Sequence, residues 1–262
     1  MSQTTPSLSP DVSIVVSRDN ESAYTLAAGT IVDLAQQAVS ARGKFTIALS
    51  GGSTPKKLYE LLASPAWQPR MPWAQTEFFW GDERYVPSTD SSSNFNMTNQ
   101  AMLSKVSVPA AQVHRVLTEK DAQEAAALYE KEVRNAVPAG SDGMPQFDLV
   151  LLGLGTNGHM ASLFPYQPAL HEKTKLVIAE YIDEVKMTRL TFSAPLINSA
   201  RQIMFVSLGP DKATVVRDVV LGVFDPERLP AQLVRPTHGK LTWILDPGSA
   251  EKLPPEIVTH QK

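Results

Sequence analysis

The sequence lacks cysteine, long apolar runs and any strong excess of charge. With no cysteine among its 262 residues, disulfide bonds, thiolate metal sites and cysteine nucleophiles are excluded. No apolar run approaches the roughly 20 residues that a membrane-spanning helix needs. The net charge of -3 gives no electrostatic reason to expect nucleic acid or an anionic membrane as a partner.

The amino terminus also lacks a targeting signal. It is polar and rich in proline and serine, without the basic region and apolar core of a signal peptide. We therefore expect a flexible tail over residues 1–11 and a soluble, cytoplasmic protein. The remaining length allows one or two domains. A Pro/Gly-rich stretch at 137–146 fits a domain boundary or a surface connection, and we expect a single α/β domain over residues 12–262.

Strand-like and helix-like segments alternate along the chain. Apolar residues repeat at helical spacing over residues 21–41, and the nearly all-apolar stretch 147–155 is typical of a strand that is covered on both faces. This alternation predicts an α/β fold with a mostly parallel sheet. The expected strands are 12–17, 44–50, 76–80, 147–155, 175–181, 188–193, 202–208 and 240–246, and the expected helices are 21–41, 54–63, 121–135 and 210–221.

A glycine-rich loop, "SGGSTP", precedes the second expected helix. Gly51 and Gly52 allow a tight turn, and Ser53 and Thr54 supply hydroxyls where Thr54 should open the helix. Free backbone N–H groups and the helix dipole would favour an anion there, especially phosphate. The loop matches neither the Walker A pattern nor GxGxxG. An ordinary capped helix start explains the same residues and, taken alone, is the simpler interpretation.

Three charged residues, Asp82, Glu83 and Arg84, open a polar loop directly after the expected strand 76–80. A solvated charge cluster is the usual explanation of such a run. Because ligands of open α/β sheets bind beyond the carboxyl ends of the strands, Arg84 could instead be a cation at the ligand. A neighbouring carboxylate would then hold it in place.

The stretch "GLGTNGH" follows the apolar strand and ends in His159. Gly153, Gly155 and Gly158 have the spacing of GxGxxG, but the acidic residue expected about twenty positions later in a dinucleotide-binding fold is missing. His159 would lie at a turn beside bare backbone, where a substrate can reach it. The other histidines are scattered without evident partners, and we expect structural roles for them: His114, His171, His238 and His260.

Five motifs occur in an order that closely resembles the 6-phosphogluconolactonase family. They are "LSGGSTPKKLYELL", "WGDERYVP…SNFNM", "FDLVLLGLGTNGHMASLFP", "RLTFSAPLINSAR" and "GPDKA". The resemblance covers residues 12 to 246. It implies a modified Rossmann-like three-layer fold, shared with glucosamine-6-phosphate deaminases. The implied reaction is hydrolysis of 6-phospho-D-glucono-1,5-lactone to 6-phosphogluconate, the second step of the oxidative pentose phosphate pathway, without a metal or organic cofactor.

The resemblance also implies roles for particular residues. A histidine can serve first as base and then as acid, and His159 is the candidate for both roles. Arg84 would hold the substrate or the developing oxyanion, with Asp82 fixing its orientation. Without the resemblance, Arg189 and Lys212 would be read as solvated surface cations. The expected substrate-binding residues, with the phosphate on the glycine loop and the two cations, are Gly51, Gly52, Ser53, Thr54, Asn157, Gly158, Arg189 and Lys212.

One position departs from the family pattern. The family shows GxDGH, and this chain has Asn157 where that aspartate would stand. Asparagine can still accept a hydrogen bond, but it brings no negative charge to the histidine. Asp82 or Glu83 could supply that charge instead.

Two other functions stay open at this point. A sugar-phosphate isomerase or deaminase of the same fold would carry a glutamate five residues after the histidine, where this chain has Phe164, and a tyrosine where it has Arg84. Both differences favour the lactonase. A non-catalytic sugar-phosphate sensor would keep the phosphate loop without needing His159. The partner in every case is a small sugar phosphate, and the sequence does not determine the oligomeric state.

Overall fold

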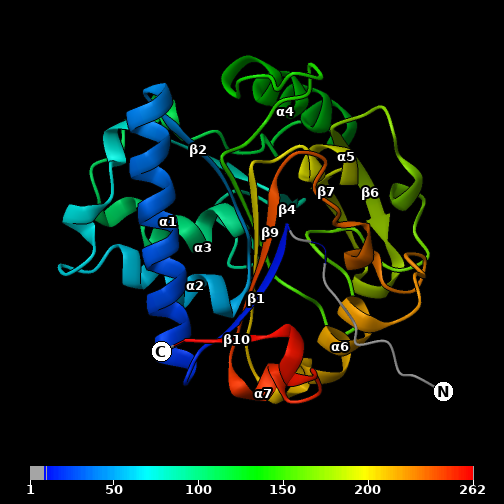
Figure 1. Ribbon diagram of the computed structural model, residues 1–262. Helices are drawn as coiled ribbons and strands as arrows, with labels where there is room; N and C mark the ends of the chain where they lie inside the picture. The colour runs from blue at the N-terminus through cyan, green and yellow to red at the C-terminus, as the bar shows by residue number, and fades with distance from the viewer. Residues whose placement is uncertain (1–8, 10, 262) are drawn as a thin grey trace.

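A seven-stranded parallel sheet forms the centre of the protein (Figure 1). The computed structural model describes residues 9 and 11–261, so residues 1–8 and 10 of the expected tail lie outside the described residues. The strand order is β10-β1-β9-β8-β5-β2-β3, with every pairing parallel. The strands are β1 (Val12–Val16), β2 (Phe45–Leu49), β3 (Thr76–Trp80), β5 (Leu149–Leu152), β8 (Gln202–Ser207), β9 (Lys240–Leu245) and β10 (Thr259–His260).

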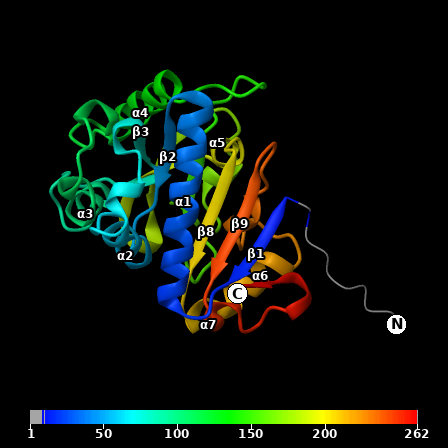
Figure 2. The same ribbon diagram turned by 60° about the vertical axis from the view of Figure 1, so that its left-hand side comes forward.

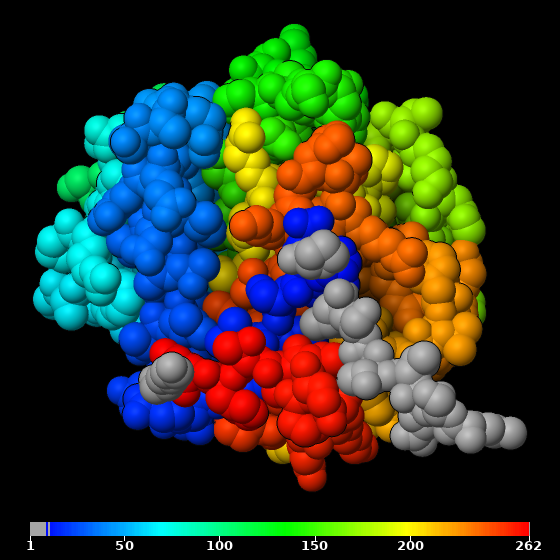
Figure 3. Space-filling model, in the orientation of Figure 1, coloured from blue at the N-terminus to red at the C-terminus, as the bar shows by residue number. Residues whose placement is uncertain are grey.

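Both faces of this sheet are covered, which gives the expected three layers (Figure 2). Side chains of β2 alternate: Phe45, Ile47 and Leu49 join one core and Ala48 joins the other. The first face carries α1 (Asn20–Arg42), α2 (Ser53–Leu62) and α3 (Asn94–Ala101), and α1 forms a long ridge on the surface (Figure 3). The second face carries α4 (Ala122–Ala136), α5 (Ala194–Asn198) and α6 (Ala213–Leu221), while α7 (Pro247–Ala250) follows β9.

A second, three-stranded antiparallel sheet lies in the layer of α4. Its order is β4 (Asp82–Arg84), β7 (Met187–Phe192), β6 (Val177–Ile182). The prediction of a polar loop after residue 80 was therefore wrong at its start and its end, where β4 and α3 form. The reason is that Glu83 is buried and accepts four hydrogen bonds, from the backbone N–H groups of Arg84, Asn94 and Phe95 and from the Ser93 hydroxyl.

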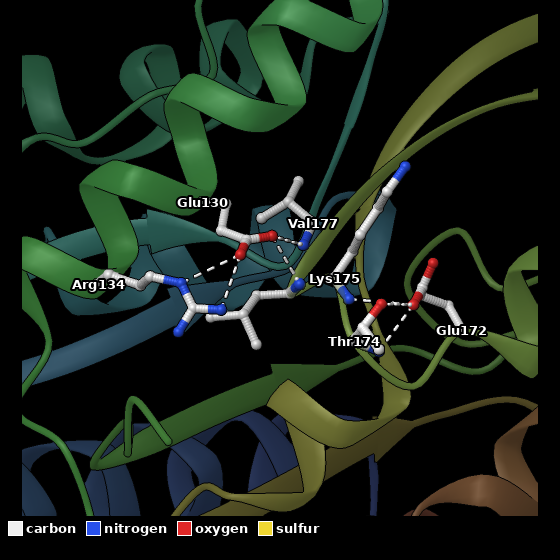
Figure 4. A network of polar contacts seen from close by, with 7 residues as sticks. Glu130, Arg134, Glu172, Thr174, Lys175 and Val177 are labelled. Atoms are coloured by element: carbon white, nitrogen blue, oxygen red, sulfur yellow. Dashed lines mark hydrogen bonds and ion pairs between the residues drawn. The ribbon is translucent and has the colours of Figure 1, made fainter. Parts of the chain in front are cut away.

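A polar network fastens this small sheet to α4 (Figure 4). Glu130 accepts hydrogen bonds from the backbone N–H groups of Leu176 (2.7 Å) and Val177 (3.4 Å), at the start of β6, and is paired with Arg134 at 2.8 Å. The nearby turn is closed by Glu172, whose pKa falls to about 2 because backbone N–H groups and the Thr174 hydroxyl donate to it. The network thereby fixes β6 and, through strand pairing, β7 and β4. These two strands carry the candidate cations Arg189 and Arg84.

The eight strands and four helices predicted from the sequence are all present, with ends shifted by a few residues. The start of α2 differs in kind. Gly52, not Thr54, is its N-cap residue, and no side chain caps the helix. Gly52 has φ of 108°, in the region that favours glycine, so the backbone of the turn rather than a hydroxyl fixes the helix start. The short elements β4, α3, α5, α7 and β10 were not predicted.

The stretch 137–146 is a surface connection between α4 and β5. Ala139 and Pro145 form an isolated antiparallel bridge, and the N–H of Gly140 donates to the carbonyl of Met144 at 2.7 Å. Strands before and after this stretch, β2 and β5, are neighbours in one sheet. We therefore propose that residues 12–262 form a single α/β domain. Among the described residues, no helix is both long and apolar enough to cross a membrane.

Candidate active site

The candidate site lies where four neighbouring parallel strands, β8, β5, β2 and β3, have their carboxyl ends. Their loops carry the glycine pair, the charged run, His159 and Lys212, as expected for a ligand site of an α/β sheet. A cavity of about 260 Å³ opens between them. It is lined by Ser50, Gly51, Gly52, Asp82, Arg84, Gly153, Leu154, Gly155, His159, Ala161 and Lys212.

His159 is held by the residue that departs from the family pattern. Its ring Nδ1 lies 2.6 Å from Oδ1 of Asn157, and its backbone N–H donates to the same oxygen at 3.2 Å. The amide nitrogen of Asn157 in turn donates to both oxygens of Glu184, at 2.9 and 3.1 Å. Within the described part of the chain, none of the hydrogen bonds engages Nε2, so Nε2 is the ring nitrogen left for chemistry.

Two neighbours fix the plane of the imidazole. The ring stacks on Phe164, with centroids 4.2 Å apart and an angle of 12° between the planes. Its other neighbour is the backbone of Gly155, where an added Cβ would come within 2.1 Å of Nδ1. Any side chain at position 155 would therefore displace His159. Gly155, one of the three glycines whose spacing superficially suggested a dinucleotide site, is thus needed to leave room for the His159 ring.

The surroundings of His159 keep it neutral. Burial is the largest effect and lowers the pKa of His159 to about 4; the Asp82 charge opposes this, and Arg189, Lys212 and Arg84 reinforce it. A neutral imidazole whose Nδ1 carries the proton presents the lone pair of Nε2. The site therefore holds a histidine that is ready to accept a proton.

Asp82 and Arg84 both line the cavity, but they do not contact each other as expected. In the described part of the chain no ion pair or hydrogen bond joins them; Arg84 donates from Nη1 to the carbonyl of Ser92 at 2.5 Å. Asp82 instead accepts from the Ser162 hydroxyl at 2.6 Å and from the amide of Asn94 at 3.3 Å. The expectation that Asp82 orients Arg84 is therefore wrong, since Arg84 is fastened to Ser92 and Asp82 to Ser162 and Asn94.

The structure brings Arg189 beside Arg84. The two are directly paired across the antiparallel strands β4 and β7, so their side chains project from the same face. Nε of each is buried without a hydrogen-bond partner. Burial and the neighbouring Arg84 lower the pKa of Arg189 from its usual value. Two adjacent cations with unused donors make a site that is suited to an anion.

Of the remaining expected residues, some line the cavity and others do not. Gly51, Gly52 and Lys212 line the cavity, whereas Ser53 is exposed at the first turn of α2 and Thr54 is half-buried there. Asn157 lies behind His159 and lines a second cavity of about 410 Å³. Gly158 is buried, and its N–H closes the turn onto the carbonyl of Gly155 at 3.0 Å.

Neither Asp82 nor Glu83 hydrogen-bonds to His159, and Glu83 is committed to the start of α3. Sequence reasoning missed Glu184, whose position 27 residues beyond Asn157 gives no local signal. It also missed Phe164 as a stacking partner of the histidine, although its place inside "GHMASLFP" is visible. Within the described residues, no group of three or more His, Cys, Asp or Glu side chains is arranged to hold a metal ion.

Comparisons with known proteins place these observations in one family. The family model of glucosamine-6-phosphate isomerases/6-phosphogluconolactonase matches residues 18–243. A 6-phosphogluconolactonase of Synechocystis sp. is 41% identical over 220 residues, which cover 84% of this chain and 89% of the relative. The solved 6-phosphogluconolactonase of Trypanosoma brucei has a TM-score of 0.82 at 28% identity, covering 92% of this chain and 98% of its own.

A monomeric glucosamine-6-phosphate deaminase superposes with a TM-score of 0.76, covering 91% of this chain and 99% of its own. At 20% identity this likeness shows the shared fold alone. The chain belongs to the glucosamine-6-phosphate isomerase/6-phosphogluconolactonase family.

Proposed function

We infer that the protein is a 6-phosphogluconolactonase, a hydrolase that opens 6-phospho-D-glucono-1,5-lactone to 6-phosphogluconate in the pentose phosphate pathway. One observation of the site supports this most strongly. A neutral histidine with a free Nε2 faces the same cavity as Arg84 and Lys212. A lactone that carries a phosphate needs both a base for water and cations for its charge.

His159 acts first as the general base. Nε2 takes one proton from a water molecule, whose oxygen attacks the carbonyl carbon of the lactone and forms a tetrahedral oxyanion. A positioned acid–base group contributes typically about 10²–10⁴-fold to the rate. The proton resides on Nε2, so the imidazole becomes an imidazolium during this step, and the nearby Asp82 charge favours that form.

His159 then acts as the general acid. The bond between the carbonyl carbon and the ring oxygen breaks, and the imidazolium returns its proton to that oxygen, which becomes a hydroxyl group. The new carboxylic acid releases its proton to solvent. Arg84, which is fastened to the Ser92 carbonyl at the cavity wall, offers its guanidinium to the oxyanion. Asp82 is a counter-charge to the imidazolium in this scheme.

The phosphate lies against the two cations and the glycine loop. Lys212 at the cavity wall and Arg189 beside Arg84 provide the charge, and the backbone of Gly51 and Gly52 provides a turn without side chains at the cavity wall. Ser53 and Thr54 follow the glycines directly, in the first turn of α2. This arrangement leaves the lactone ring between the phosphate site and His159.

Phe164 supports the lactonase over a deaminase or isomerase. It occupies the position where the deaminase relatives carry a glutamate, and it stacks on the His159 ring instead of offering a second proton-transfer group. A sensor protein would not need the pair of neighbours that fix this ring. Catalytic turnover of the phospholactone separates the lactonase from the deaminase, the isomerase and the sensor.

The test is hydrolysis of freshly prepared 6-phosphogluconolactone by the purified protein, measured as acid release against a blank without enzyme. We expect a rate far above the spontaneous hydrolysis, and the same rate after exhaustive chelation, because His159 can activate water without a metal. A rate equal to the blank would overturn the function. Activity that disappears with chelator and returns with a divalent ion would overturn the metal-free mechanism.

A further inference from the structure

We propose that Glu184 is a positioning residue for catalysis, which acts through the Asn157 amide to keep His159 in the tautomer with a free Nε2. Three contacts in series carry this inference: the Glu184 carboxylate, the Asn157 side chain and the His159 ring. The proposal rests on the function inferred above. It concerns this chain in particular, since the usual aspartate of the family is absent.

The direction of each hydrogen bond follows from what each group can do. A carboxylate only accepts, so Glu184 turns the NH₂ end of Asn157 toward itself. The amide oxygen must then face His159, and because this oxygen also only accepts, Nδ1 must carry the ring proton. The lone pair is therefore left on Nε2, where the proposed base is needed.

Without Glu184 the asparagine could turn over. Its NH₂ group would then donate to Nδ1, the ring proton would move to Nε2, and the histidine could no longer accept a proton from water there. Among the described residues one other contact opposes this rotation, the bond from the His159 backbone N–H to Oδ1, and at 3.2 Å it is the longer of the two that the oxygen accepts. An aspartate would not need such help, since both of its oxygens accept.

Glu184 reaches Asn157 from a cavity other than the one that His159 lines. It belongs to the single turn Asp183–Val185 between β6 and β7, and together with Asn157 it lines the second cavity, whereas His159 lines the first. Asn157 thus lies between the two cavities. Glu184 contacts neither the reacting atoms nor the cations in this arrangement, which is why its effect is on orientation.

Single variants give the first test. Glu184→Ala should lower kcat about tenfold with little change in KM, the loss expected for one hydrogen bond that orients a reacting group. Asp183→Asn is the matched control. It removes one negative charge from the same turn, and no side-chain hydrogen bond of Asp183 is found in the described structure, so kcat should stay at the wild-type value. Equal kcat in wild type and both variants would overturn the proposal.

A charge exchange gives the sharper test. Asn157→Asp alone restores the family residue but sets two carboxylates against each other at the present 2.9 and 3.1 Å, so kcat should fall. Adding Glu184→Gln supplies an amide that donates to the new aspartate, and kcat should return to within about threefold of wild type. Additive losses in the double variant would contradict the proposal.

The tautomer can also be read without any activity. In protein labelled with ¹⁵N-histidine, the signals of His159 are identified among the five histidines by their loss in His159→Gln. Wild type should show proton on Nδ1, and Glu184→Ala should show a mixture of both tautomers. A wild-type ring protonated on Nε2, or an unchanged tautomer in Glu184→Ala, would refute the positioning role. Failure of the lactonase assay alone would instead refute the proposed function.

Discussion

Two histidines of this protein are built into similar stacks but have opposite surroundings. His114 stacks on Phe79 with centroids 4.3 Å apart, and His159 stacks on Phe164 at 4.2 Å. The ring of His114 is held at both nitrogens by carboxylates, Glu132 at 2.7 Å and Glu77 at 2.8 Å. His159 instead meets a neutral amide at one nitrogen and has cations around it.

This difference shows how the partners of a histidine decide its use. Both nitrogens of His114 are occupied, so neither is available to water or a substrate, and its 9% exposed side chain joins β3 to α4. One nitrogen of His159 is occupied by an acceptor, no hydrogen bond of the described structure engages the other, and the residue lines a cavity. The expectation of a structural role for His114 is supported by these contacts, although its two partners were not foreseen.

The largest expected effect is that of removing the proposed base. His159→Ala should lower kcat on the phospholactone by about 10²–10⁴-fold, the span of a positioned acid–base group. The fold should be kept, because the ring lies at a cavity wall rather than in either core. Steady-state kinetics with circular dichroism measures both. Loss of folding with unchanged turnover of the folded fraction would make His159 a structural residue like His114.

A smaller effect, on KM, is expected from removing the cations near His159, which His114 lacks among its hydrogen-bond partners. Arg189→Ala and Lys212→Ala should each raise KM for the phosphorylated lactone, since a charge-assisted contact is worth roughly 1.5–3 kcal/mol, or about 10- to 150-fold. Unphosphorylated gluconolactone serves as the control substrate and should be affected far less. Equal losses on both substrates would move these residues away from the phosphate.

The smallest effect is a shift of the pH profile. Because protonation removes the base, kcat/KM on unphosphorylated gluconolactone should fall as the pH drops through the pKa of His159, about 4, and stay level above it. With the phosphorylated substrate, kcat should fall at a higher pH, because the bound phosphate neutralises Arg189 and Lys212, which lower that pKa. Identical midpoints for kcat/KM on unphosphorylated gluconolactone and for kcat on the phosphorylated substrate would contradict this electrostatic account.

The regular parts of the fold were predictable because their signals are local. Alternation and helical spacing in segments such as 21–41 and 147–155 depend on burial in a layered sheet, and the strands and helices expected from them are present. The strand β4 was not predictable in this way. Its residues Asp82 and Glu83 are charged, and hydrogen bonds from distant residues, Ser162, Ser93 and the start of α3, help to make their burial favourable.

The residues of the site were predictable from the sequence, but the hydrogen bonds between them were not. The strand ends and the family motifs pointed to His159, Arg84 and Lys212, which line one cavity. The link from Asp82 to Ser162 spans 80 positions, and that from Asn157 to Glu184 spans 27. Such pairs follow from how β4, the turn between β6 and β7, and the loop after β5 meet in space, and no spacing in the sequence marks them.

The most direct test of the central claim compares two variants in one assay. His159→Gln and His114→Gln each keep a similar size and a hydrogen-bonding group while removing proton transfer by the ring, and kcat is measured per folded molecule, with thermal melting as the measure of stability. We expect His159→Gln to melt near the wild-type temperature with kcat lowered by at least about 10²-fold. We expect His114→Gln to lose about 1–3 kcal/mol of stability while the folded protein keeps near-wild-type kcat. A folded His159→Gln protein with wild-type kcat would contradict the account.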